Sequence, residues 1–175
     1  MSPAGWTLDF ASEVGRLKRV ICHSPAPELT VVTPSNRKDY LFDDILDLEL
    51  ARREHSRFVA ILSRFAEVLE ISDLLTEILA IPEARSYVVE NSGDAIRERA
   101  TDLTAEELTR LYIEGEESRG GALAELVNES GYALPPLPNL FFTRDAAAVI
   151  GDGVMVASMR HEVRWSEEVL SHALF

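Results

Sequence analysis

The sequence contains one cysteine, Cys22, among its 175 residues. A single cysteine excludes a disulfide within the chain and favours a reducing compartment, so we expect a cytoplasmic protein. The opening residues, MSPAGWTLDF, lack the basic segment and apolar stretch of a secretory signal peptide. No segment reaches the roughly 18 consecutive apolar residues that a membrane span needs. We therefore expect no membrane partner.

Basic residues are scarce relative to acidic ones. Lysine and arginine number 17 against 30 aspartates and glutamates, which gives a formal net charge of −13. Such a charge repels phosphate backbones, so we expect no nucleic-acid partner. The hydrophobic fraction of 46% and the charged fraction of 27% are ordinary for a globular protein. The length fits one domain, with at most a small addition.

The first third of the chain has the pattern of a strand, a long helix and a second strand. Apolar and basic residues alternate in GRLKRVIC, which predicts a half-buried strand with Cys22 as a small core or edge residue. The strongest helical spacing follows in LFDDILDLELARREHSRFVAIL, where Asp44 is the expected cap, and EVLEIS then predicts a short strand. This order indicates a βαβ-type unit. The expected apolar stripe of the helix, with a core histidine in it, consists of Leu48, Ala51, His55, Phe58, Leu62 and Phe65.

Residues 72–131 have a different character, with helical spacing almost throughout. Thr104 and Glu107 form a capping-box pattern, and Gly115 follows as a stop signal. The segment GGALAELVNESG predicts a further helix, and only Tyr87–Val89 gives a strand signal. The pattern indicates a small all-helical insert.

The last part of the chain returns to strand patterns. Three prolines in YALPPLPNL predict a stiff, extended connection. Strands are then expected at Phe141–Thr143, Ala146–Ile150 and Val154–Ser158, with a hairpin turn at Gly151–Asp152–Gly153 between the last two. The segment MRHEVRWSEEVL predicts a final helix.

Two charges, Arg144 and Asp145, stand inside the apolar run PPLPNLFFTRDAAAVI. One interpretation is a structural ion pair or a turn aspartate. The other is a carboxylate held on a rigid strand to bind a cation, for which the planar fork of a guanidinium is the best match. The residues alone leave both interpretations open.

Several motifs resemble those of the arginine deiminases, in the guanidine-modifying superfamily. They are VGRLKRVICHSP, LTVVTPSN, LFDDI, LPPLPNLFFTRD and GDGVMVASM, followed by Arg164. The resemblance implies an α/β fold that is part of a five-bladed propeller of ββαβ modules with an inserted small helical domain. The implied divisions are residues 1–71 for the first module, 72–131 for the insert and 132–175 for an incomplete return to the propeller.

The resemblance also implies a reaction, the hydrolysis of L-arginine to L-citrulline and ammonia without a metal or organic cofactor. By position, Asp145 matches the family aspartate that binds the guanidinium and polarises its carbon, so we expect it to face the site rather than bulk water. Arg164 matches an arginine that pairs with the α-carboxylate of the substrate. Asn139 and Phe142 match residues that line the site, and Leu41 matches a further contact. The alternatives are core packing for Leu41 and Phe142 and a surface salt bridge for Arg164.

Part of the family's catalytic set has no match in this sequence. The resemblance implies a nucleophilic cysteine, an acid–base histidine and a glutamate, all of which lie beyond this chain in the family. Cys22 aligns with the first strand instead, and Trp165 stands where the family commonly has a second arginine. We therefore expect the chain to be inactive alone, and to act as a homo-oligomer or with a complementary C-terminal half.

Two other hypotheses remain open. One is a non-catalytic module that binds arginine or another guanidino compound, or that regulates a full-length enzyme by associating with it. The other is an acidic α/β domain that shares only the fold. In this last case Asp145 should face a structural lysine or arginine.

Overall fold

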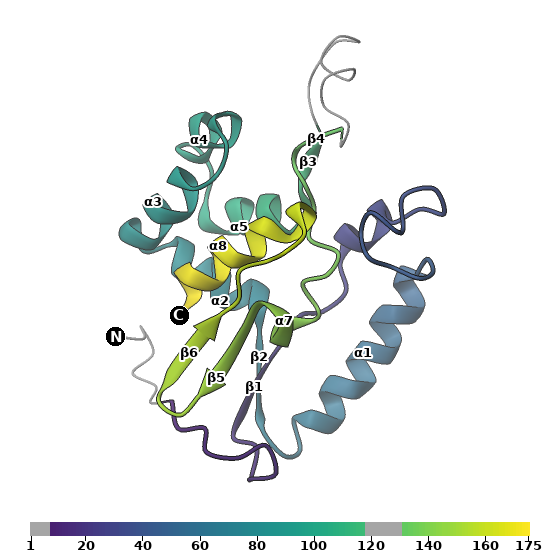
Figure 1. The fold of residues 1–175 in the computed structure, drawn as a ribbon, viewed down its shortest axis with the longest axis vertical. Helices are drawn as coiled ribbons and strands as arrows, with labels where there is room; N and C mark the ends of the chain where they lie inside the picture. The colour runs from purple at the N-terminus through teal and green to yellow at the C-terminus, as the bar shows by residue number, and fades with distance from the viewer. Residues whose placement is uncertain (1–7, 118–130) are drawn as a thin grey trace.

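The structure, a computed structural model, describes residues 8–117 and 131–175. In this part of the chain the strands form three separate two-stranded sheets. Most helices gather at one end of the molecule, and the strands of two sheets lie at the other (Figure 1). The fold is mixed α/β, as predicted, whereas the closed propeller stays a prediction.

The predicted βαβ unit is confirmed. Strand β1 (Arg19–Cys22) leads through a 3₁₀ turn, η1 (Pro27–Val31), to helix α1 (Leu48–Leu62), and β2 (Glu67–Glu70) follows. The two strands pair in parallel, with Arg19 opposite Glu67 and Cys22 opposite Glu70. Parallel neighbours require a crossover connection, and α1 provides it.

Helix α1 begins later than its sequence predicts. Its cap is Asp47, whose Oδ1 accepts a hydrogen bond of 2.7 Å from the Leu50 backbone N–H, whereas the Asp44 side chain bonds to Ile45. The prediction of Asp44 as the cap is therefore wrong. An aspartate bonded to the next residue closes a local turn and leaves the cap position to the later one.

Helix α1 has no fully buried residue. Leu48, Ala51, His55 and Leu62 of the predicted stripe are half-buried, but Phe58 and Phe65 are exposed. The ring of His55 lies 6.3 Å from that of Phe58. The apolar face of α1 is thus wider than the area that η1 and β2 cover.

Four helices follow in the predicted insert: α2 (Ile71–Leu79), α3 (Pro82–Glu90), α4 (Asp94–Ala100) and α5 (Ala105–Glu114). The strand signal at Tyr87–Val89 is wrong, because these residues continue α3 and Val88 packs in the core. The capping box of Thr104 and Glu107 is present, and Gly115 ends α5. The helix predicted in 120–131 falls almost entirely outside the described residues.

A short antiparallel strand pair follows the helices. Strand β3 (Glu116–Glu117) pairs antiparallel with β4 (Tyr132–Leu134). Gly115, before β3, has a φ of +75°, and an added Cβ would lie 2.5 Å from the Pro136 backbone nitrogen. Only glycine fits this close approach between α5 and the proline segment.

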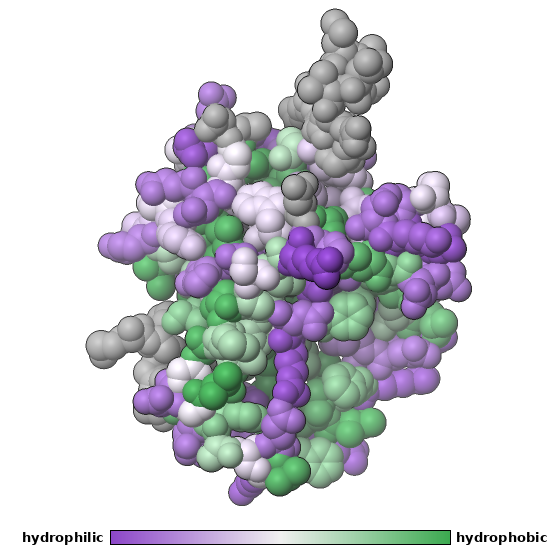
Figure 2. Space-filling model, in the orientation of Figure 1, coloured by the Kyte–Doolittle hydropathy of each residue, from purple (hydrophilic) through white to green (hydrophobic). Residues whose placement is uncertain are grey.

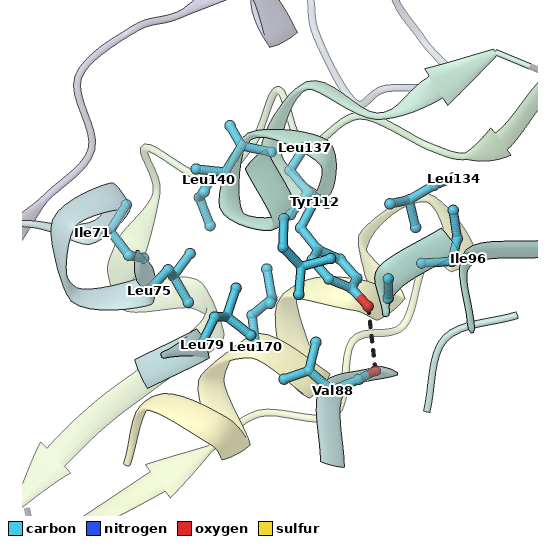
Figure 3. Packing of buried hydrophobic residues seen from close by; sticks show 13 residues of the cluster. Ile71, Leu75, Leu79, Val88, Ile96, Tyr112, Leu134, Leu137, Leu140 and Leu170 are labelled. Carbon is cyan, nitrogen blue, oxygen red and sulfur yellow. Dashed lines mark hydrogen bonds between the residues drawn. The ribbon is translucent and has the colours of Figure 1, made fainter. Parts of the chain in front are cut away.

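One large hydrophobic core joins the helices to the later part of the chain. It combines residues of α2–α5 with Leu134, Leu137 and Leu140 from the proline segment and with Leu170. Figure 3 shows Tyr112 pointing into this cluster, with its hydroxyl directed toward Val88. The proline segment is therefore buried and fixed by packing, in agreement with its predicted stiffness.

The last part of the chain contains a helical turn, a hairpin and a helix. Residues Thr143–Ala146 form the short helix α7, so the strand predicted at Phe141–Thr143 is wrong. Strands β5 (Ala147–Ile150) and β6 (Gly153–Val156) form the predicted antiparallel hairpin, and Ile150 pairs with Gly153, which leaves a two-residue turn. A 3₁₀ turn, η2 (Glu162–Arg164), then leads into the predicted final helix, α8 (Trp165–Leu174).

Candidate functional site

Asn139 links two distant segments of the chain. Its side chain is buried at the end of the proline segment, and its Nδ2 donates a 2.9 Å hydrogen bond to the Tyr40 carbonyl oxygen. The next residue, Leu41, has a φ of +66°. This left-handed conformation is unusual for leucine and marks a locally strained backbone. The predicted site residues Asn139 and Leu41 are therefore brought close together.

Phe142 and Asp145 follow Asn139 in two successive turns. The Phe142 backbone N–H donates to the Asn139 carbonyl, and the Asp145 N–H donates to the Phe142 carbonyl, each at 2.9 Å. The Phe142 ring lies 4.1 Å from the ring of Phe141 and is itself exposed. Leu41 is exposed as well, so neither Leu41 nor Phe142 is a core residue.

Asp145 lies on α7 rather than on the predicted rigid strand. Its Oδ2 accepts a hydrogen bond of 2.9 Å from Arg164 Nη1, while its side chain remains 53% exposed. Its sequence neighbour Arg144 points to a different partner, Glu13. The carboxylate thus pairs with a cation and is half-exposed to solvent. The geometry is compatible with both interpretations of Asp145, the structural ion pair and the accessible cation-binding group.

Arg164 is held on its other edge by Glu167. Nε and Nη2 each donate a 2.7 Å hydrogen bond to one oxygen of the Glu167 carboxylate. The Arg164 side chain is 10% exposed and that of Glu167 is 1% exposed, so this ion pair is buried rather than on the surface. Burial by itself lowers the pKa of Arg164, but hydrogen bonds and charges from Glu167 and Asp145 outweigh this effect and raise it.

Glu167 is the neighbour of the site that the sequence analysis missed. Arg164 and Glu167 stand three residues apart at the start of α8, where side chains at this spacing can meet. That spacing was the available signal. It could not show that the pair is buried, because burial depends on α8 packing against the helical core.

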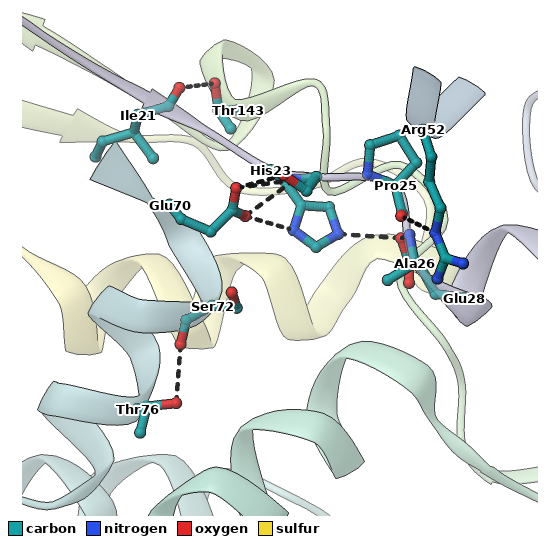
Figure 4. A network of polar contacts seen from close by, with 11 residues as sticks. Ile21, His23, Pro25, Ala26, Glu28, Arg52, Glu70, Ser72, Thr76 and Thr143 are labelled. Atoms are coloured by element: carbon teal, nitrogen blue, oxygen red, sulfur yellow. Dashed lines mark hydrogen bonds and ion pairs between the residues drawn. The ribbon is translucent and has the colours of Figure 1, made fainter. Parts of the chain in front are cut away.

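A second polar cluster lies at the end of β1 (Figure 4). Buried His23 lies between two carboxylates, with Nε2 3.0 Å from Glu28 Oε1 and Nδ1 3.4 Å from Glu70 Oε1. Burial alone lowers the pKa of His23, but its bonds to Glu28 and Glu70 outweigh burial and raise the pKa to about 8. Glu70 also accepts hydrogen bonds from Ser24, so the cluster ties the end of β1 to η1 and to β2.

Cys22 precedes this cluster and is buried, as predicted. Burial, followed by the charge of Glu70, raises the pKa of its thiol. A raised pKa disfavours the thiolate that nucleophilic chemistry needs. Cys22 therefore has the environment of a core residue.

Two surface hollows lie away from the predicted site residues, and one of them borders the His23 cluster. One, of about 490 Å³, is lined by residues that include Arg16, Lys18 and Arg64, and the other, of about 360 Å³, includes His23 and Arg110. None of the five predicted site residues lines either hollow. The described residues show no group of three or more histidine, cysteine or acidic side chains placed to hold a metal ion. Within residues 8–117 and 131–175, no helix has both the length and the apolar character to cross a bilayer.

Comparison with known proteins places these features in one family. The family described as arginine deiminase matches residues 38–175, a range that contains all five predicted site residues. Curated arginine deiminases from Borrelia garinii subsp. bavariensis and Borreliella afzelii are 32% and 34% identical over 187 residues, covering 96% of this chain. The arginine deiminase of Streptococcus pyogenes serotype M49 is 35% identical over 187 residues, covering 94% of it.

The chain spans about half the length of these relatives. The matched segment covers 46% of the two spirochaete proteins and 45% of the streptococcal one. This coverage agrees with the N-terminal portion expected from the order of the motifs. The chain therefore belongs to the arginine deiminase family.

Proposed function

We propose that this chain carries the guanidinium- and carboxylate-binding part of an arginine deiminase-type hydrolase. In this proposal Asp145 receives the guanidinium of L-arginine and Arg164 pairs with its α-carboxylate. Asn139 fixes the backbone before Leu41, and Leu41 and Phe142 border the ligand. The reaction needs no metal or organic cofactor, and the protein acts in the cytoplasm.

The observation that carries the proposal is the adjacency of two opposite charges. Asp145 Oδ2 and Arg164 Nη1 lie 2.9 Å apart, and the Asp145 side chain is 53% exposed. Leu41 and Phe142 are exposed as well. A guanidino acid carries the two complementary charges, so one ligand can satisfy both residues. Successive backbone hydrogen bonds connect Asn139, Phe142 and Asp145, which gives the three residues a fixed relation.

The chemistry also needs groups that this chain does not match. Without the family's nucleophile and acid–base residues, a substrate-binding part retains almost none of the rate, because these groups act as a unit. We therefore propose that a C-terminal half, on the same or a separate polypeptide, supplies them and closes the propeller.

The exposed side of α1 fits such a partner. Leu50, Phe58 and Ile61 lie on this helix, Phe65 follows it, and all four side chains are between 42% and 69% exposed. Figure 2 shows hydrophobic side chains gathered over the lower part of the molecule, where the strands and α1 lie. Two-stranded sheets also leave edges that a further strand can pair.

Co-expression tests this function directly. The chain is produced together with the C-terminal part of the streptococcal relative, beyond the matched segment, and citrulline is measured after arginine is added. We expect citrulline from the pair, none from either piece alone, and none when the pair carries Asp145→Asn. A folded, associated pair that forms no citrulline would contradict the proposal.

A second candidate is a non-catalytic module that binds arginine. It is favoured by the 53% exposure of the Asp145 side chain, which leaves a carboxylate open to a cationic ligand. Calorimetry distinguishes the two: arginine binding that depends on Asp145, with no citrulline from any associated C-terminal half, would favour the module.

A further inference from the structure

The guanidinium of Arg164 is divided between two carboxylates. Glu167 occupies the Nε and Nη2 edge through two bonds of 2.7 Å, and Nη1 alone reaches Asp145. Glu167 is 1% exposed, whereas Asp145 is 53% exposed. One partner is therefore fixed inside the protein, and the other stands where a ligand can reach it.

We propose that Glu167 is a positioning residue for ligand selection, and that the Asp145–Arg164 pair closes the empty site until a guanidino acid replaces it. This inference rests on the proposed function. Glu167 holds the plane of the Arg164 guanidinium, so that only the Nη1 side is free to change partner. The ligand guanidinium takes Asp145, and the ligand carboxylate takes Nη1.

Ion-pair exchange of this kind selects for ligands with both charges. When L-arginine binds, its guanidinium replaces Arg164 as the partner of Asp145, and its carboxylate replaces Asp145 as the partner of Arg164. Agmatine, which has the guanidinium but no carboxylate, takes Asp145 and leaves Nη1 of a largely buried arginine without an anion. Loss of one buried, charge-assisted hydrogen bond lowers affinity by roughly tenfold to a hundredfold.

Glu167 matters because it accepts two bonds at once. A glutamine has nearly the same shape, but its amide offers one acceptor oxygen and presents an N–H₂ donor to the other guanidinium nitrogen. In Glu167→Gln, Arg164 is free to turn and to bind Asp145 through two nitrogens. The closing pair becomes tighter, and the carboxylate of a ligand loses its fixed partner.

Calorimetric titration of the chain with L-arginine and with agmatine tests the proposal. We expect the native chain to prefer arginine by roughly tenfold or more. In Glu167→Gln we expect weaker arginine binding and a preference that falls to about threefold or less. Glu13→Gln, which breaks the neighbouring exposed Arg144 pair, serves as the matched control and should keep the native preference.

Three results overturn the inference in distinguishable ways. If neither ligand binds the native chain, either alone or paired with a C-terminal half, both the proposed function and the inference fail. If both bind the native chain equally, or if Glu167→Gln weakens both equally and keeps their ratio, only the inference fails. Should Glu167→Gln not fold, the ¹⁵N resonances of Arg164 in the native chain decide: arginine must shift Nη1 and leave Nε in place, and an unchanged Nη1 in the bound state contradicts the exchange.

Discussion

The helical core and the exposed side of α1 both contain large apolar side chains, but only those of the core are covered by other parts of the chain. In the core, Leu75, Val88, Leu108 and Leu137 are at most 1% exposed and belong to one cluster that joins α2, α3 and α5 to the proline segment. Helix α1 has no buried residue, and Phe58 is 53% exposed. The core is complete within the described residues, whereas α1 presents a surface suited to a partner.

Because of this difference, we expect core substitutions to affect stability and α1 substitutions to affect association with a partner. Substitutions in the core should reduce the free energy of unfolding, because they create cavities in a close-packed interior. Substitutions on the exposed side of α1 should leave the chain stable and change only its association with a C-terminal half. The following predictions test that separation, in order of decreasing expected effect on stability.

Leu108→Ala should have the largest effect. Leu108 is fully buried in the core, so truncation should lower the free energy of unfolding by about 3 kcal/mol. Leu50→Ala on α1 is the matched control, since Leu50 is 42% exposed, and it should cost less than about 1 kcal/mol. Chemical denaturation followed by circular dichroism measures both. Equal losses for the two variants would contradict the comparison between the regions.

The His23 cluster should make stability depend on pH. The folded pKa of His23 is about 8, above its ordinary value of 6.5. The extra stability is therefore fully present below pH 6.5 and is lost as the pH rises through about 8. The difference between these two pKa values corresponds to about 2 kcal/mol.

Unfolding experiments between about pH 5.5 and about pH 9 measure this effect, because they extend about one pH unit on either side of the transition. In His23→Gln most of the decline should disappear, because the titrating group is gone. His172→Gln, which removes an exposed histidine on α8, should keep the native decline. A native chain whose stability does not fall over this range would show that His23 is not the charged partner of Glu28 and Glu70.

The capping box of α5 should contribute a smaller amount. Thr104 Oγ1 accepts from the Glu107 N–H, and Glu107 Oε2 accepts from the Thr104 N–H, at 3.2 and 2.8 Å. Thr104→Ala should cost about 1 kcal/mol, and Thr104→Ser should be nearly neutral because serine caps as well. Thermal unfolding distinguishes them, and an alanine variant as stable as the serine variant would rule out a contribution from the cap.

Phe58→Ser should have the smallest effect on the isolated chain. Its ring is 53% exposed, so the free energy of unfolding should change by less than about 1 kcal/mol. Association with a C-terminal half should weaken measurably, because the ring belongs to the proposed partner surface. Analytical ultracentrifugation of the mixture measures this, with Ser56→Ala on the same helix as the control. Undiminished association of Phe58→Ser would remove α1 from the interface.

The sequence predicted local structure well where the pattern is regular. The βαβ unit, the capping box at Thr104 and the β5–β6 hairpin are all confirmed. It failed at Phe141–Thr143, where two successive local hydrogen bonds form turns and the side chain of Asn139 binds the distant Tyr40 carbonyl. Tyr87–Val89 became helical for a similar reason, since Val88 packs into the helical core.

For the candidate site as well, the sequence predicted which residues matter but not the features that depend on tertiary packing. Motif resemblance identified Asp145 and Arg164 as neighbours in function, and the structure brings their side chains together. The roles proposed for the five residues stay predictions. Burial of Arg164 and its bidentate bond to Glu167 could not be read from spacing, because they depend on where α8 packs.

Titration of the chain with L-arginine, compared between the native protein and Asp145→Asn, tests the central claim most directly. Asp152→Asn, at the exposed hairpin turn, is the matched control. If Asp145 receives the guanidinium, the native chain and the control bind arginine and Asp145→Asn loses at least tenfold in affinity. Equal binding by all three, or no binding by a folded native chain with or without a C-terminal half, would contradict the claim.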